Sequence, residues 1–156
     1  MNVVYLGLGS NLGDRKLFLE SAINEINRLP YVDLLAVSQL YESEPESGDE
    51  TEPAYLNQCC SVETALPPEE LLYTLMEVEQ KLGRATKGDR APRSIDIDIL
   101  LYGDEVVLND DLTIPHPLMH ERAFVLEPLA DIAPDVMHPI IGKTVNQLLE
   151  ELLKEP

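Results

Sequence analysis

Two aspartates, Asp96 and Asp98, stand in a run of isoleucines, and their spacing makes them the first candidates for chemistry. Ile95, Ile97 and Ile99 alternate with polar residues, which is the period of two of a β-strand with unlike faces. The two carboxylates therefore leave the predicted strand on one side, roughly 7 Å apart, where both can reach one divalent cation or one each of a pair. The alternative is that this acidic face only meets water, as in a half-exposed antiparallel sheet.

Positive charge gathers directly upstream of the aspartates, although the formal net charge of the chain is −18. Five of the eleven lysines and arginines lie there: Lys81, Arg84, Lys87, Arg90 and Arg93. Their spacing is close to a helical turn, so a solvated helix face is the competing interpretation. Gly83, Gly88 and Pro92 would interrupt such a helix, which favours a loop whose cations converge on an anion. Cations followed by paired carboxylates are what a polyphosphate with Mg²⁺ requires.

Composition limits the class of protein. A chain of 156 residues with 44% hydrophobic residues is expected to fold as one domain, residues 1–156. The charge of −18 argues against a nucleic-acid partner, because a polyanion would be repelled. No apolar run is long enough to cross a bilayer and no basic leader is present, so we expect a cytoplasmic protein without membrane contact. Cys59 and Cys60 are neighbours and poorly placed to bridge, which fits a reducing compartment.

The order of predicted elements indicates an α+β fold. Strand patterns alternate with two helical patterns and are followed by two more helices, the first containing Pro128 and the last opening on a capping box at Thr144 and Gln147. We expect a ferredoxin-like, mainly antiparallel sheet with helices packed on its faces in αβα layers. The strands are predicted at 3–9, 32–41, 55–64 and 95–102, with another starting at 105, and the helices at 14–29, 67–82, 121–132 and 145–154.

Several segments of the chain together resemble a known family. They are Leu8-Gly9-Ser10-Asn11-Leu12-Gly13-Asp14, Tyr55-Leu56-Asn57, Leu82-Gly83-Arg84, the run from Ala91 to Gly103, and Ile114-Pro115-His116-Pro117 with Arg122 to Leu126. Over nearly the whole chain the sequence is similar to the 6-hydroxymethyl-7,8-dihydropterin pyrophosphokinase (HPPK) family. The resemblance implies transfer of diphosphate from ATP to the pterin hydroxymethyl group, with release of AMP, in tetrahydrofolate biosynthesis.

The resemblance also implies roles for residues around ATP. Asp96 and Asp98 would bind two Mg²⁺ ions that bridge the ATP phosphates and the pterin hydroxyl, which is chemically sensible because a metal-bound alcohol loses its proton more easily. Arg84 and Arg93 match family positions that contact ATP or steady its phosphates, and these four residues form the expected catalytic set. Lys87 lies close enough to help. The remaining positions that match the surroundings of the nucleotide are Glu79, Ile99, His116 and Arg122.

A second group of positions matches the family's pterin site. The pterin is expected between Tyr55 and Phe124, whose flat faces suit a fused ring, while Asn57 offers a donor and an acceptor to its edge. Ordinary core filling is the alternative for both aromatic residues. The other positions of the expected pocket are Gly9, Ser43, Pro45 and Asp96. The acidic stretch from Glu44 to Glu52 matches the family's mobile loop, which closes over substrates.

Two other classes of protein remain compatible with the residues alone. A different Mg²⁺-dependent nucleotide phosphohydrolase would use the same carboxylates and cations without a pterin. A non-catalytic, small-molecule-binding regulatory module would carry the carboxylates as surface residues. The expected partners are the small molecules ATP and 6-hydroxymethyl-7,8-dihydropterin, and nothing in the sequence demands more than a monomer.

Overall fold

A five-stranded antiparallel sheet forms the centre of the computed structural model, which describes residues 1–45, 48, 51–83 and 95–154. The strands β2 (Val32–Val37), β4 (Tyr55–Thr64), β1 (Asn2–Ser10) and β5 (Asp96–Tyr102) lie in that order, and β3 (Tyr41–Ser43) pairs with β4. Each of these pairings is antiparallel. The central strand β1 therefore lies between β4 and β5.

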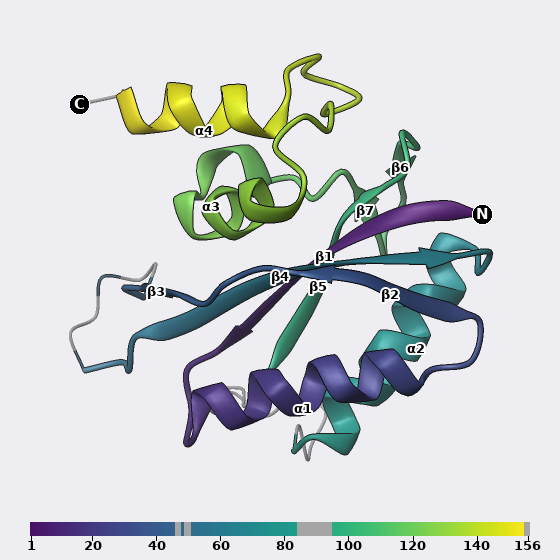
Figure 1. Ribbon diagram of the computed structural model, residues 1–156, viewed down its shortest axis with the longest axis vertical. Coiled ribbons are helices and arrows are strands. Elements are labelled where there is room, and N and C mark those ends of the chain that lie inside the picture. The colour runs from purple at the N-terminus through teal and green to yellow at the C-terminus, as the bar shows by residue number, and fades with distance from the viewer. Residues whose placement is uncertain (46–47, 49–50, 84–94, 155–156) are drawn as a thin grey trace.

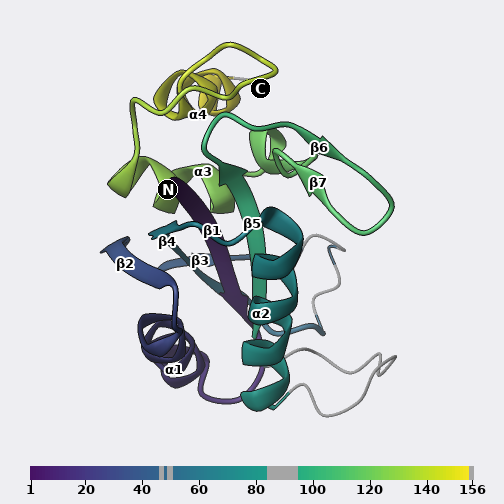
Figure 2. The ribbon, with the colours of Figure 1, turned by 90° about the vertical axis from the view of Figure 1, so that its right-hand side faces the viewer.

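Helices cover both faces of this sheet (Figures 1 and 2). Helix α1 (Arg15–Arg28) follows β1 and helix α2 (Pro68–Lys81) follows β4, and both pack on one face. Helices α3 (Ala123–Ile132) and α4 (Val145–Lys154) lie over the other face. The order β1-α1-β2-β3-β4-α2-β5, in which β3 is a short strand beside β4, and the strand order β2-β4-β1-β5 confirm the predicted α+β, ferredoxin-like arrangement in αβα layers.

The face under α1 and α2 is an aliphatic core. Alternate residues of the central strand β1 and of the edge strand β5 point into it, including Val4, Leu6 and Leu8 of β1, and Ile97 and Ile99 of β5. Their side chains are at most 5% exposed, and they pack against buried side chains of α1 and α2, namely Leu19, Ala22, Ile26, Leu71, Leu75 and Val78. Burial of this apolar surface is the main stabilising contribution to the sheet.

The opposite face has a smaller core that α3, α4 and a short 3₁₀ helix (Met119–Glu121) complete. A β-bulge in β5 contributes side chains to this core. Tyr5 pairs with Leu101 but Leu6 pairs with Ile99, so Leu100 is the extra residue. Because of that extra residue, Leu100 and Leu101 both pack toward α3 and α4, while Tyr102 returns to the core under α1 and α2. The bulge thus puts Leu101 on the face that carries Asp96 and Asp98, and Tyr102 on the opposite face.

Three predicted elements differ from the structure. The strand expected over 32–41 is split into β2 and β3, and Ser38 between them donates from its backbone to the Cys59 carbonyl at 2.8 Å. The helix expected over 121–132 begins at Ala123 and continues through Pro128, which is buried in it. The strand expected to start at 105 is instead β6 (Val107–Leu108), which pairs with β7 (Thr113–Ile114) in a small separate sheet.

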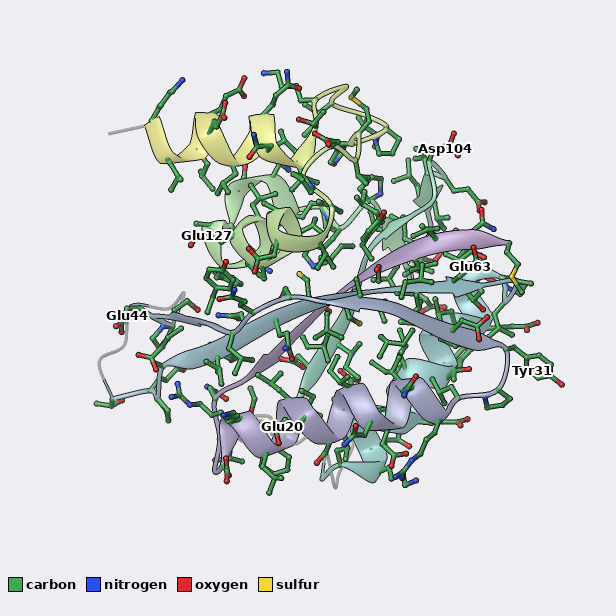
Figure 3. The ribbon with its side chains drawn as sticks, viewed as in Figure 1. Glu20, Tyr31, Glu44, Glu63, Asp104 and Glu127 are labelled. Carbon is green, nitrogen blue, oxygen red and sulfur yellow. The ribbon has the colours of Figure 1, made fainter. Side chains whose placement is uncertain are left out.

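Helix α4 begins as predicted, with a capping box. The Gln147 backbone N–H donates to Thr144 Oγ1 at 3.1 Å, and the Thr144 N–H donates to Gln147 Oε1 at 2.9 Å. Among the described residues, none of the helices is both long and apolar enough to span a membrane. The acidic side chains labelled in Figure 3, such as Glu20, Glu63 and Asp104, lie on separate parts of the surface, so the negative charge is spread around the molecule.

Candidate active site

Two glycines of the central strand form the floor of the candidate site. Gly9 lies opposite Asn57 of β4 on one side and Asp96 of β5 on the other, and Gly7 lies between Cys59 and Asp98 in the same way. A methyl group at Gly9 would come within 3.5 Å of Asn57 Oδ1. Because neither glycine carries a side chain, the polar side chains of β4 and β5 face each other across a low floor.

A cavity of about 250 Å³ lies over this floor. Three parts of the chain supply its walls: the end of the β3–β4 hairpin, the two polar positions of β5, and the start of α3. The lining residues that sequence analysis had placed near a ligand are Gly9, Ser43, Tyr55, Asn57, Asp96, Asp98, His116, Arg122 and Phe124. Nine expected positions, from β1, the β3–β4 hairpin, β5, the segment after β7 and the start of α3, therefore meet in one cavity.

Asp96 and Asp98 both line this cavity, as the alternation of the strand predicts. Asp96 is half-buried and Asp98 is exposed. Asp98 and His116 also line a second cavity of about 280 Å³, whose walls include Leu72 and Ile99. Asp98 consequently lies at the junction of two cavities, with Asp96 beside it in the first, and each cavity is large enough to admit part of a small ligand.

Strand β5 is held in place on its outer edge by residues from elsewhere in the chain. The backbone N–H of Ile97, which lies between the two aspartates, donates to Glu79 Oε2 at 2.7 Å. Glu79 comes from α2 and is only 5% exposed, and it lines neither of these cavities. A carboxylate that accepts this N–H satisfies an edge strand that would otherwise offer its donors to water.

His116 is fixed at the bulge of the same strand. Its backbone N–H donates to the Leu100 carbonyl at 3.0 Å, and its Nδ1 accepts from the Leu118 N–H at 3.2 Å. With Nδ1 engaged as an acceptor, a neutral imidazole carries its proton on Nε2. The ring is therefore held beside Asp98 in a defined orientation at the junction of the cavities.

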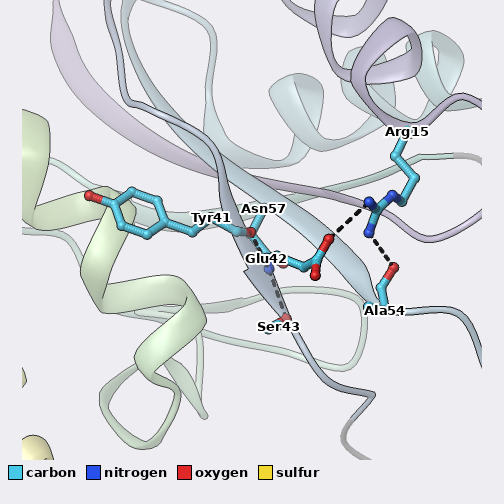
Figure 4. A network of polar contacts seen from close by, with 6 residues as sticks. All are labelled: Arg15, Tyr41, Glu42, Ser43, Ala54 and Asn57. Atoms are coloured by element: carbon cyan, nitrogen blue, oxygen red, sulfur yellow. Dashed lines mark hydrogen bonds and ion pairs between the residues drawn. The ribbon is translucent and has the colours of Figure 1, made fainter. Parts of the chain in front are cut away.

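The wall built by the β3–β4 hairpin depends on Asn57 (Figure 4). The amide nitrogen of Asn57 donates to the Tyr41 carbonyl at 3.0 Å and to Ser43 Oγ at 2.8 Å. Both amide hydrogens are thus used to hold β3, while the oxygen lies on the side of Gly9. Of the donor and acceptor that the sequence suggested for a pterin edge, the structure leaves the acceptor facing the cavity floor.

The wall built by α3 combines an aromatic ring with a cation. The guanidinium carbon of Arg122 lies 5.6 Å from the centroid of the Phe124 ring, which is a cation–π arrangement. Arg122 lines the first cavity, together with Phe124 and with Tyr55 from the opposite wall. A flat, electron-rich ring bound between the two aromatic residues would have this cation at its edge.

The donor set suits a Mg²⁺ ion that a ligand helps to hold. Within the described ranges, no group of three or more His, Cys, Asp or Glu side chains is placed to hold a metal. Asp96 and Asp98 supply two carboxylates on one wall. Mg²⁺ typically uses one or two protein carboxylates and completes its six oxygen ligands with water and substrate phosphates. The two aspartates fit that mode, and they do not fit a closed all-protein site.

Some expected residues lie apart from the cavities. Pro45 is buried, and its carbonyl accepts from the Gly48 N–H at 3.1 Å, but it does not line the first cavity. Arg84, Lys87 and Arg93 fall outside the described residues, as does part of the acidic stretch from Glu44 to Glu52.

Sequence reasoning missed several cavity residues, among them Gly7, Gln58, Cys59 and Val125. Gly7 was detectable, because it lies two positions before Gly9 on the same face of a strand. Cys59 was detectable in the same way, because it lies two positions after Asn57 on the same face of β4. Burial raises the pKa of the Cys59 thiol well above its usual value, and the thiol sulfur lies 3.7 Å from the Val125 carbonyl as its donor. It is therefore a neutral wall residue.

Comparison with known proteins connects this site to one family. A family model described as 7,8-dihydro-6-hydroxymethylpterin-pyrophosphokinase (HPPK) matches residues 5–134. The 2-amino-4-hydroxy-6-hydroxymethyldihydropteridine pyrophosphokinase of Aquifex aeolicus is 40% identical over 156 residues, covering 100% of this chain and 96% of that protein.

Other relatives are longer. The folic acid synthesis protein fol1 of Pneumocystis carinii is 42% identical over 150 residues, which are 96% of this chain and only 20% of that protein. The crystal structure of wild-type Plasmodium falciparum HPPK-DHPS superimposes with a TM-score of 0.78 at 18% identity, covering 96% of this chain and 44% of that one. The chain thus spans about a fifth of the length of the first relative and shares the fold of part of the second.

Proposed function

Because the chain belongs to the HPPK family, we propose that it transfers a diphosphate group from ATP to the hydroxymethyl group of 6-hydroxymethyl-7,8-dihydropterin and releases AMP. The observation that carries this proposal is the junction of two cavities at Asp98 and His116. A two-substrate transfer requires both reactants to lie side by side with their reacting atoms at one point. The carboxylate pair lies at that point.

We place the pterin in the first cavity. Tyr55 and Phe124 line it from different segments and offer flat surfaces for a fused ring. The oxygen of Asn57 accepts a hydrogen bond from the ring's amino or ring N–H groups, while its nitrogen holds the hairpin. The hydroxymethyl group then points toward Asp96 and Asp98.

We place the nucleotide in the second cavity. Leu72 and Ile99 provide apolar walls for a base, and Asp110 and Asp111 provide acceptors for an exocyclic amino group. The phosphates would extend past His116 toward the aspartates. We propose Arg84, Lys87 and Arg93 as phosphate ligands on the basis of their sequence positions. Arg122, which was also expected near the nucleotide, lines the first cavity.

The chemistry follows from this placement. Mg²⁺, for which we propose two ions at Asp96 and Asp98, would lower the pKa of the pterin hydroxyl and offset the charge of the phosphates. The hydroxymethyl oxygen attacks the β-phosphorus, the bond from that phosphorus to the oxygen bridging it to the α-phosphate breaks, and AMP departs with that oxygen. The hydroxyl proton passes to water. The contributions of this chain are the positioning of both substrates and the two negative charges that hold the cations.

The test is AMP release from ATP and Mg²⁺, measured with and without 6-hydroxymethyl-7,8-dihydropterin. We expect AMP to appear only when the pterin is present, in equal amount to the pterin diphosphate. Equal AMP or phosphate release without the pterin would indicate a nucleotide phosphohydrolase. Tight pterin binding without any AMP would indicate a binding module.

A further inference from the structure

The wall of the first cavity that Ser43, Tyr55 and Asn57 provide belongs to a short hairpin stem, which we define as residues 41–43 and 55–57. Its pairing is brief: Tyr41 pairs with Asn57, Glu42 with Leu56 and Ser43 with Tyr55. The arm at 55–57 is the start of β4 and also pairs with β1, where Leu56 lies opposite Ser10 and Asn57 opposite Gly9. The arm at 41–43 is attached to β4 through these three pairs, which are a weak support because they bring few backbone hydrogen bonds and little apolar burial. The position of Ser43 relative to Tyr55 and Asn57 therefore depends on which side chains also hold the stem.

Arg15 binds the hairpin stem from the sheet face away from the cavity (Figure 4). Its Nη1 donates to the Ala54 carbonyl at 2.8 Å, and its Nη2 donates to Glu42 Oε2 at 3.0 Å. Glu42 lies on one arm of the hairpin, and Ala54 directly precedes the other arm. One guanidinium group thus connects the two arms just where the pairing ends.

The backbone of Arg15 is fixed at the start of helix α1. Arg15 is the first residue of α1, and the Asp14 carboxylate caps that helix by accepting the Leu17 N–H at 3.1 Å. Helix α1 follows β1, so the segment that carries the cavity floor at Gly9 leads directly to the residue that holds the wall. The Arg15 side chain is 29% exposed, which is less than half the exposure of Glu42 at 62%.

We propose that Arg15 is a positioning residue for the pterin: by bridging Glu42 and Ala54 it fixes the hairpin stem, and so sets Ser43, Tyr55 and Asn57 at the cavity. The identity of the ligand rests on the proposed function, whereas the bridge itself does not. A planar guanidinium offers separate donors to two acceptors at a fixed angle, which a lysine ammonium does not. An exposed ion pair contributes little to global stability, so the effect should appear in ligand binding and local opening.

The experiment compares Arg15→Gln, Arg15→Lys and Glu42→Gln with a matched control, Arg28→Gln. Arg28 lies in the same helix, is 77% exposed and forms an ion pair with Glu25 of the preceding turn at 3.6 Å. Pterin binding is measured by calorimetry and turnover by AMP release, with hydrogen exchange of residues 41–57 followed in parallel. For Arg15→Gln we expect about tenfold weaker pterin binding and about tenfold faster exchange in the stem, as for loss of charge-assisted hydrogen bonds.

The variants should form a series. Arg15→Lys and Glu42→Gln each weaken one contact, so both should fall between the wild type and Arg15→Gln, and the double variant Arg15→Gln/Glu42→Gln should be no worse than Arg15→Gln. The KM for ATP, the melting temperature and all properties of Arg28→Gln should stay at wild-type values.

Unchanged pterin binding and unchanged exchange in Arg15→Gln would overturn the proposal. So would an equal loss for both substrates together with a lower melting temperature, because that pattern belongs to general destabilisation. If the wild type does not bind the pterin at all, the proposed function fails, and the exchange measurement still decides whether Arg15 holds the stem.

Discussion

The two faces of the sheet are built from the same strands and differ completely in composition. On β1, the side chains of Leu6 and Leu8 point to α1 and α2 and are at most 3% exposed. The alternating residues Gly7 and Gly9 line the cavity on the other face. On β5, Ile97 and Ile99 are buried while Asp96 and Asp98 line the cavity. One face is filled by an aliphatic core, whereas the other combines the polar cavity with the smaller core under α3 and α4.

The comparison teaches how a small protein combines stability with an open site. The strand period of two keeps the requirements of the faces apart, since neighbouring residues outside the bulge at Leu100 point to opposite faces. The stable face supplies a rigid platform, and the backbone of that platform sets the spacing of the polar groups on the other side. Substitutions on one face should therefore affect activity and those on the other should affect stability.

The largest effect is expected from Asp96→Ala and Asp98→Ala. Each removes one of the two carboxylates proposed to hold Mg²⁺ under the phosphates, so pterin-dependent AMP release should fall on the order of 10²–10³-fold. The urea midpoint should barely change. Asp33→Ala, at an exposed position of β2, is the matched control and should keep full activity. A large fall in the urea midpoint together with the loss of AMP release would show that these aspartates also stabilise the fold, against the proposed division between the two faces.

On the opposite face, Leu6→Ala should affect stability first. Leu6 is fully buried in the core under α1 and α2. Its truncation leaves a cavity and should lower the free energy of unfolding by about 2–5 kcal/mol, measured by urea denaturation. Leu35→Ala, at a position of β2 that is 52% exposed, should cost less than about 1 kcal/mol. The folded fraction of Leu6→Ala should retain its affinity for the pterin.

Gly9→Ala tests the cavity-bearing face by itself, because the added methyl group lies on that face. The new methyl group would lie 3.5 Å from Asn57 Oδ1 and 3.7 Å from Tyr55 Cδ1, which are ordinary contacts, so the fold should tolerate it. The methyl group would occupy the cavity floor, and pterin affinity should fall roughly tenfold by calorimetry, as when an extra carbon is forced into a filled site. Wild-type affinity would show that the ligand does not reach this floor.

The smallest effect concerns His138, in the turn between α3 and α4 that helps to cover the open face. Its Nδ1 accepts from the Ile140 and Ile141 N–H groups at 3.2 and 3.1 Å, and burial, with the nearby His120, lowers its pKa from 6.5. A lowered pKa means that the neutral ring stabilises the fold above pH 6.5, and that this contribution is lost as the pH falls through the folded-state pKa. His138→Asn should therefore flatten the decline of urea stability below pH 6.5. An unchanged decline would show that other groups cause it.

The alternation in β5 was enough to predict the faces of Asp96 and Asp98, because polar and apolar residues mark them. It could not reveal the bulge, since Leu100, Leu101 and Tyr102 are all apolar at positions of opposite face. The fold class followed from the order of elements. The junction at His116 could not be derived from spacing, because it depends on how the segment after β7 packs against β5. Glu79 was expected near the nucleotide, and its contact with Ile97 is a tertiary contact that no local pattern encodes.

The extra residue at Leu100 has a consequence for how this chain can change in length. Deleting it would restore uninterrupted pairing with β1 and leave Asp96, Asp98, Leu101 and Tyr102 on their present faces. The deletion would still remove one fully buried side chain from the core under α3 and α4. A shortened strand should therefore keep its carboxylates in place and lose stability where α3 and α4 cover the sheet.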